Sequence, residues 1–229
     1  MYLNVVSFNN IEIANELKLN GETLLTYKIE YPEFISDCYQ RSLKGINKFY
    51  SDRAASFQKY CQNDLFKMAV KQYRDDIANG FPIRTFEALL TYKVTYLYSC
   101  VISIYFDRYE YTGGAHGNTT RDSQTWNLQK PGLIELRQLI SCSSDCRAYI
   151  LSEVNAQIQD EPDIYFENYK ELTGETFCAK NFFCVQEGVV LYYQQYEIAP
   201  YSSGIREFLL PYSYCVKDPS NLCRQKSKI

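Results

Sequence analysis

A glycine-rich segment that holds the only histidine of the chain is the first candidate for chemistry. Residues 109–118 read Tyr-Glu-Tyr-Thr-Gly-Gly-Ala-His-Gly-Asn, which places three glycines within five positions around the histidine. Imidazole can act as a base or contact a ligand near neutral pH, and closely spaced glycines favour a fixed, tightly folded backbone. We name residues 109–118 the glycine–histidine segment. Its candidate binding residues are Tyr111, Gly113, Gly114, His116 and Asn118.

Catalysis by His116 would need partners, and the sequence shows none in a recognisable pattern. There is no Gly-x-Ser-x-Gly nucleophile elbow, no Walker loop and no dinucleotide fingerprint. Asp107 and Glu110 lie close by in sequence, but a glycosidase needs two carboxylates at a fixed separation, which sequence alone does not define. A loop histidine bonded to the local backbone is therefore the favoured interpretation. We predict no catalytic residue and lean against an enzyme.

A second candidate surface lies near the C-terminal end of the chain. Residues 192–201 read Tyr-Tyr-Gln-Gln-Tyr-Glu-Ile-Ala-Pro-Tyr and combine aromatic rings with side-chain amides. We name them the aromatic–amide segment. Such a surface can bind protein or glycan, whereas the structural alternative is a strand that leaves its sheet into a packed loop. The candidate contact residues are Tyr196, Glu197, Pro200 and Tyr201.

Composition narrows the partners. The net charge is -3 and the pI is about 5.4, so nothing directs the molecule as a whole to nucleic acid. The 22 tyrosines suit half-buried sheet faces and also binding surfaces. No apolar run is long enough for a membrane span, and residues 1–6 lack the pattern of a signal peptide. We therefore expect a cytoplasmic protein if Met1 is the native start, and an exported one if a signal lies upstream.

The nine cysteines form no pattern that binds metal. Cys142 and Cys146 are the nearest approach to a half-site, but a second pair is missing and the chain has one histidine. We predict no metal and no cofactor. An odd number of cysteines excludes complete pairing within the chain. We expect free and mostly buried thiols, which favours a reducing compartment.

Periodicity in the first half predicts strands beside one long helix. Apolar alternation indicates strands at 11–18 and 23–31 around Asn20-Gly21, a hairpin signal, with Pro32 ending the pairing. Three- and four-residue spacing predicts a helix over 36–78, or two helices with a break at 62–64, stopped by Gly80. Further strands are expected at 86–96 and 100–111, as an antiparallel pair, and at 118–128.

The second half mixes short helices and strands. Helices are predicted at 134–140 and at 146–158, the second with Asp145 as its N-cap, and strands at 182–185, 189–193 and 207–211. The pattern indicates an α+β fold with antiparallel sheets packed against one long and several shorter helices. We expect one compact unit of two intertwined lobes: residues 1–130 with the hairpin, long helix and antiparallel strands, and residues 131–229 with the remaining helices and strands.

Two stretches together resemble a known bacterial domain. They are residues 106–119, which contain the glycine–histidine segment, and residues 188–201, continued by Gly204 and Pro211-Tyr212. Both are similar to the extracytoplasmic domain of the lysozyme-sensing anti-sigma-V factor and to the region that precedes the catalytic domain of a related peptidoglycan deacetylase. With the hairpin and the long helix, the resemblance covers residues 20–215.

The resemblance implies a non-catalytic binding or sensing module at the cell envelope. Its implied partner is a protein such as lysozyme or a cell-wall glycan. This chain shows no transmembrane helix and no appended deacetylase domain, so regulation of a sigma factor is not carried over. Two alternatives stay open: an envelope polysaccharide-active enzyme, and a cytoplasmic protein that keeps the fold for another role.

Overall fold

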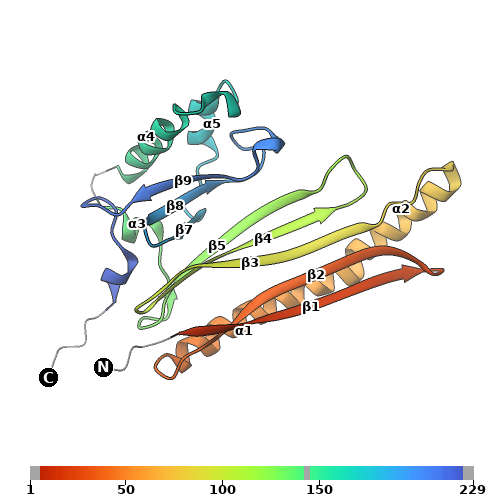
Figure 1. Ribbon diagram of the computed structural model, residues 1–229, viewed down its shortest axis with the longest axis horizontal. Helices are drawn as coiled ribbons and strands as arrows, with labels where there is room; N and C mark the ends of the chain where they lie inside the picture. The colour runs from red at the N-terminus through yellow and green to blue at the C-terminus, as the bar shows by residue number, and fades with distance from the viewer. Residues whose placement is uncertain (1–5, 142–144, 224–229) are drawn as a thin grey trace. The chain divides into compact units, whose positions relative to one another are not determined.

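The protein has the expected α+β fold (Figure 1). The computed structural model describes residues 6–141 and 145–223. The chain divides into two compact units, which we describe separately. The helix-backed unit consists of Ser7–Tyr92 and Phe106–Thr120; the disulfide-bonded unit consists of Met1–Val6, Lys93–Tyr105 and Arg121–Ile229. A six-stranded sheet of order β1-β2-β3-β4-β5-β6 has strands in both, because β3 (Phe86–Tyr98), β4 (Val101–Tyr111) and β5 (Asn118–Asn127) pass from one to the other.

A long β-hairpin opens the helix-backed unit. β1 (Ser7–Leu19) pairs antiparallel with β2 (Glu22–Ile35), and the turn between them holds Asn20 at φ 54° and Gly21 at φ 90°. Asparagine and glycine tolerate these left-handed values best, so the Asn-Gly pair fixes the turn and the register. The expected hairpin is confirmed, with strands longer than the alternation predicted.

The expectation that Pro32 ends the pairing is wrong. Pro32 faces Asn10 inside the β1–β2 ladder, and β2 continues to Ile35. β2 pairs with β3, in parallel, only from Leu25 to Ile29. In the described register, the side of β2 that faces β3 therefore forms no ladder hydrogen bonds beyond Ile29. Proline is tolerated at such an edge because it has no N–H to leave unpaired.

One continuous helical rod covers β2. α1 (Gln40–Tyr60) leads through a π-helical turn (Cys61–Leu65) into α2 (Phe66–Asn79), and Gly80 ends it at φ 70°. The break expected at 62–64 is thus a π-turn within an unbroken rod. The buried face of α1 carries Leu43, Ile46, Tyr50, Ala54 and Phe57 at helical spacing. Figure 1 shows the rod on one face of the β1–β2 hairpin, where it passes behind both strands.

The disulfide-bonded unit adds short elements around a three-stranded sheet. They are β6 (Gly132–Leu133), α3 (Leu136–Leu139), α4 (Cys146–Ile158), α5 (Tyr169–Glu175), β7 (Phe182–Cys184), β8 (Gly188–Tyr193) and β9 (Arg206–Pro211). β7, β8 and β9 pair antiparallel in that order. Asp145 accepts a hydrogen bond from the Ala148 N–H at 2.9 Å, as its predicted N-cap role requires. Every residue of β8 is buried, so this sheet lies at the centre of its unit.

The expectation of free thiols throughout is wrong. Cys100 and Cys223 form a disulfide across 123 residues, and Cys215 is disulfide-bonded as well. A pairing this distant leaves no spacing pattern in the sequence, which is why cysteine counting missed it. Cys61 and Cys184 are free and buried, and burial raises the pKa of each thiol to about 12. Both are therefore unreactive at neutral pH.

No helix within residues 6–141 and 145–223 is both long and apolar enough to cross a membrane.

Candidate functional site

The glycine–histidine segment is a tight junction between β4 and β5 in the helix-backed unit. Gly113 has φ +86°, and a Cβ there would lie 3.3 Å from Cδ of Arg84, whose guanidinium donates to the Gly113 carbonyl at 2.7 Å. A Cβ on Gly117 would lie 2.3 Å from the ring of Tyr109. Glycine is therefore required at both positions, at the first mainly for its backbone angle and at the second for space.

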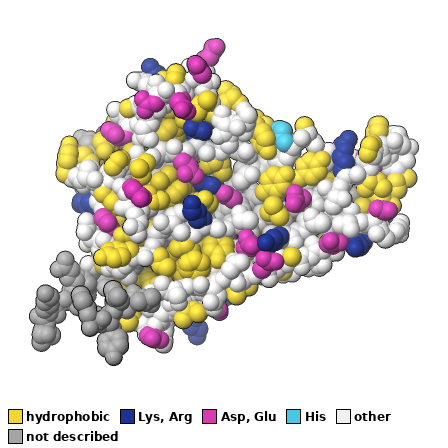
Figure 2. All heavy atoms as spheres, in the orientation of Figure 1, with side chains coloured by type: hydrophobic (Ala, Val, Ile, Leu, Met, Phe, Trp, Pro, Cys, Tyr) yellow, Lys and Arg dark blue, Asp and Glu magenta, His cyan; other side chains and the backbone are white. Residues whose placement is uncertain are grey.

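His116 lies on the surface of this junction. Its Nδ1 donates to the Gly117 carbonyl at 2.9 Å, and the side chain is exposed. Figure 2 shows the single histidine, in cyan, at the surface. The expected bond to local backbone is confirmed. Tyr111 is half-buried and Asn118 is exposed, so the segment presents a small polar surface.

The aromatic–amide segment lies in the disulfide-bonded unit, so the structure does not bring the nine candidate residues into a single described site. The rings of Tyr196 and Tyr201 lie 5.8 Å apart, and 52% of Tyr196 is exposed. Tyr196 has φ 68°, a left-handed value that is costly for a bulky residue. Pro200 is exposed and leads into the 3-10 turn at Tyr201–Ser203.

Glu197 has a structural role in this loop. Its carboxylate accepts a hydrogen bond from the Gln194 N–H at 2.6 Å. Burial raises the pKa of the Glu197 carboxyl, and the backbone hydrogen bond partly offsets this shift. Glu197 therefore closes the turn at the end of β8, and Tyr196 and Pro200 remain as the exposed candidate residues of the segment.

Arg121 on β5 is the centre of the best-defined polar cluster, and the sequence analysis missed it. Its guanidinium lies 3.7 Å from the ring centroid of Tyr105 and forms an ion pair with Glu207. Only 8% of the Arg121 side chain is exposed. A cation held over an aromatic face and paired with a carboxylate has little freedom to move, so Arg121 fixes the positions of Tyr105 and Glu207.

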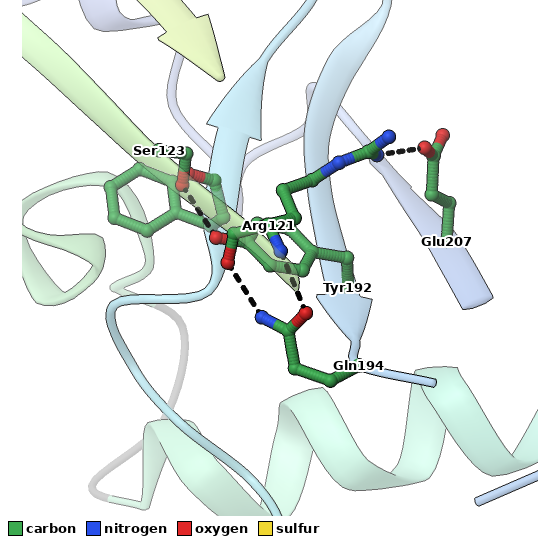
Figure 3. Close-up of polar contacts among 6 residues, drawn as sticks. Arg121, Ser123, Tyr192, Gln194 and Glu207 are labelled. Atoms are coloured by element: carbon green, nitrogen blue, oxygen red, sulfur yellow. Dashed lines mark hydrogen bonds and ion pairs between the residues drawn. The ribbon is translucent and has the colours of Figure 1, made fainter. Parts of the chain in front are cut away.

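The Gln194 amide holds the main chain of Arg121 from the other direction (Figure 3). The Arg121 N–H donates to Gln194 Oε1 at 2.9 Å, and Gln194 Nε2 donates to the Arg121 carbonyl at 2.6 Å. Two residues along, Ser123 Oγ donates to the Phe182 carbonyl at 2.5 Å and lies 3.1 Å from the Tyr192 hydroxyl. Side chains thus connect β5 to β7 and β8 where no backbone ladder is described.

An open groove of about 290 Å³ lies beside this cluster. Tyr105 and Phe183, with ring centroids 5.0 Å apart, form the aromatic part of its lining. Apolar valines and a polar rim complete the lining: Val94, Val185 and Val190, with Lys93, Thr95, Gln186, Glu187 and Glu207. An apolar floor with a few charged and amide groups at the rim is the usual composition of a small-ligand site.

A groove of this chemistry suits a saccharide. The C–H face of a sugar ring packs on aromatic side chains, and its hydroxyl and acetamido groups bond to carboxylates, amides and ammonium groups. No group of three or more His, Cys, Asp or Glu that could hold a metal occurs among the described residues. The signal for this cluster in the sequence was the aromatic–amide segment, which contains Tyr192 and Gln194, whereas no pattern singled out Arg121.

The structure defines an α+β protein, and comparison with solved structures gives the same fold. Residues 19–119 match the family model described as deacetylase PdaC, and residues 138–213 match the model of a protein family of unknown function, DUF3298. The chain is 23% identical over 195 residues to the peptidoglycan-N-acetylmuramic acid deacetylase PdaC of Bacillus subtilis. The matched region includes 84% of this chain and 38% of the deacetylase, so this chain spans less than half the length of that relative.

Two solved structures share the architecture. A DUF3298 family member from Bacteroides fragilis superposes with a TM-score of 0.73 at 17% identity, covering 94% of this chain and 95% of that one. A DUF3298 family protein from Pseudomonas aeruginosa gives a TM-score of 0.57 at 16% identity, with the same coverage. At these identities the likeness concerns the fold. The chain is therefore similar to a deacetylase-related region and to DUF3298 in consecutive parts.

Proposed function

We propose that this chain is a non-catalytic binding module of the bacterial cell envelope that binds peptidoglycan glycan in the groove beside Arg121. The groove carries the proposal, because Arg121 holds Tyr105 of its lining and Glu207 of its rim in place before any ligand arrives. A preformed site loses little conformational entropy on binding. The similarity to a peptidoglycan deacetylase supports the ligand class.

The disulfide supports a location in the cell envelope. Disulfides persist in oxidising environments outside the cytoplasm and are rare within it. Cys100–Cys223 joins the turn between β3 and β4 to the C-terminal part of the described chain, where it holds the end of the unit. This favours an envelope location over the cytoplasmic alternative.

Calorimetric titration with soluble fragments of the N-acetylglucosamine–N-acetylmuramic acid glycan tests the proposal. We expect saturable binding by the wild-type protein and about tenfold weaker binding by Lys93→Ala, since one hydrogen bond to a charged group is worth about 1.5–3 kcal/mol. Lys130→Ala is the matched control, because Lys130 is exposed and lies outside the groove. No binding, or equal affinity for the two variants, would contradict the proposal.

The same samples test the absence of catalysis. We expect the mass of the recovered glycan to be unchanged after long incubation with the protein. Loss of an acetyl group or cleavage of the chain would replace the binding proposal with the enzyme alternative.

A second candidate ligand is a protein such as lysozyme. This candidate rests on the resemblance to the anti-sigma-V ectodomain. We expect such a partner to contact one of the two candidate segments through its exposed side chains, His116 or Asn118 in one unit, or Tyr196 or Pro200 in the other. Titration with lysozyme should then give binding that is weakened by one of the two variants, His116→Ala or Tyr196→Ala, and unaffected by Lys93→Ala. Affinity unchanged by both segment variants would remove these residues from the site.

A further inference from the structure

The outer edge of β1 in the helix-backed unit is long, and no other described strand pairs with it. β1 has 13 residues and is the first strand in the order of its sheet, so only β2 pairs with it among the described strands. Figure 1 shows β1 at the margin of the hairpin. An open edge presents a row of backbone N–H and C=O groups that another strand can pair with.

Proteins commonly protect such edges with charges, prolines or bulges. One face of β1 has no charged residue and no proline, and the β1–β2 ladder has one irregularity, between Leu17 and Lys18. The odd-numbered positions of β1 continue the helix-covered face of β2, since Ile13 faces the buried Ile29 and Leu17 faces the buried Leu25. On this face Ile11, Ile13, Leu17 and Leu19 are only half-buried. The strand thus has an incompletely covered apolar stripe along an open edge.

The sequence of β1 is complementary to itself in one antiparallel register. Two copies of one strand pair antiparallel about a two-fold axis. The axis must therefore pass between one residue and the same residue of the second copy. With the axis at Asn15, Ile13 faces the second copy of Leu17 and Ile11 that of Leu19. On the opposite face Glu12 then meets the second copy of Lys18. Apolar groups meet apolar groups, and opposite charges meet, at every one of these positions.

Neighbouring registers lose this match. With the axis at Ala14, Glu12 faces Glu16 twice and Ile13 faces Asn15 twice. With the axis at Asn15 the paired stretch extends from Ile11 to Leu19. Like charges directly opposite each other are unfavourable, so the register is specified by charge as well as by the apolar stripe.

The surface around Asn15 is also hollowed. An open hollow of about 600 Å³ is lined by Ala14, Asn15, Glu16 and Lys18 of β1 and by Thr26 and Tyr27 of β2. Because β2 residues also line it, the hollow lies over the hairpin, next to the β1 edge that a second copy would approach. We propose that the protein forms a homodimer in which β1 pairs antiparallel with β1 of a second copy, centred on Asn15.

Sedimentation velocity over a concentration series, with charge-reversal variants, tests the dimer. We expect reversible dimerisation of the wild-type protein. Glu12→Lys and Lys18→Glu should each raise the dimer dissociation constant about tenfold, because each places like charges opposite one another twice. The double variant should restore the wild-type value. Glu33→Lys is the control, since it makes the same charge change at an exposed position on β2 outside the pairing.

Cross-linking tests the register. In the Asn15→Cys variant the two new thiols would lie opposite each other, and a short bis-maleimide should join them. In the Asn9→Cys variant they would lie far apart, although Asn9 is equally exposed and on the same face. Exposed Cys38 and Cys178 contribute the same background to both.

A monomer at all concentrations would overturn the dimer, and so would a double variant as weak as the single ones. Equal cross-linking of the two cysteine variants would overturn the register. The glycan groove belongs to the other unit, so loss of dimerisation and loss of glycan binding are separate results.

Discussion

The helix-backed unit and the disulfide-bonded unit hold their surfaces in different ways. In the helix-backed unit, long regular elements form the surface. A 13-residue strand pairs with a 14-residue strand, and a continuous helical rod covers them. In the disulfide-bonded unit, strands are short, and specific side chains complete the connections. Gln194 bonds to the main chain of Arg121, Ser123 to that of Phe182, and Cys100 to Cys223.

The difference matters for function. Regular elements leave repetitive surfaces, such as a strand edge, which recognise another strand through backbone groups. Side-chain connections create an irregular surface with groups at fixed positions, which suits a small polar ligand. The two proposals accordingly place self-association in the helix-backed unit and glycan binding in the disulfide-bonded unit. Variants that each remove one of these side-chain connections show whether the structure of the disulfide-bonded unit depends on that connection.

The largest effect is expected from removal of the disulfide. Cys100→Ala combined with Cys223→Ala should lower the free energy of unfolding by about 2–5 kcal/mol, because the link restricts the unfolded chain over 123 residues. Denaturant unfolding measures the loss. Hydrogen exchange followed by mass spectrometry should show faster exchange in β7–β9 and unchanged exchange in α1 and α2.

Cys178→Ala is the control for that experiment, since Cys178 is exposed and free. Equal acceleration of exchange in both units would show that they do not differ in the way described. Stability unchanged by the double variant would show that the side-chain bonds suffice without the link.

The Gln194 amide is expected to matter less. Gln194→Leu keeps the approximate volume but removes both bonds to the Arg121 main chain, so we expect a loss of about 1–3 kcal/mol in the free energy of unfolding. Weaker glycan binding should accompany it, because Arg121 positions Tyr105 and Glu207 at the groove. Gln159→Leu, at an exposed position after α4, should change neither quantity. Identical results for the two variants would remove the amide from the account of the groove.

Local patterns in the sequence predicted the regular elements well. Asn20-Gly21 predicted the hairpin, three- and four-residue spacing predicted the rod, and Asp145 predicted the start of α4. Each of these depends on residues within one turn or one hairpin. α5 was missed because it is short, contains Gly174 and buries only Thr173, so it has no apolar periodicity to detect.

The site depended on distant partners and was mostly missed. Arg121 meets Glu207 and Gln194 across more than 70 positions, and the disulfide spans 123. The parallel pairing of β2 with β3 likewise requires the whole rod between them. Contacts of this kind leave no periodic trace, so one sequence could indicate aromatic and amide segments but not the groove that Tyr105 and Phe183 line.

The smallest effect, at the glycine–histidine segment, tests the structural interpretation of that motif. Gly113→Ala should lower the free energy of unfolding by about 1–2 kcal/mol, because its φ of +86° is unfavourable for a residue with a Cβ. Gly114→Ala should change it by no more than about 0.5 kcal/mol, since the nearest atom to its Cβ lies 3.8 Å away. Chemical denaturation of the two variants measures the difference.

Adjacent glycines thus give a matched pair that separates backbone conformation from composition. If both substitutions cost the same, the segment is not the fixed junction that Gly113 and its bond from Arg84 indicate. If only Gly113→Ala is costly, the helix-backed unit also contains one irregular, conformationally specified connection. The contrast between the units would then be one of degree, because His116 would be presented by a junction as fixed as the groove around Arg121.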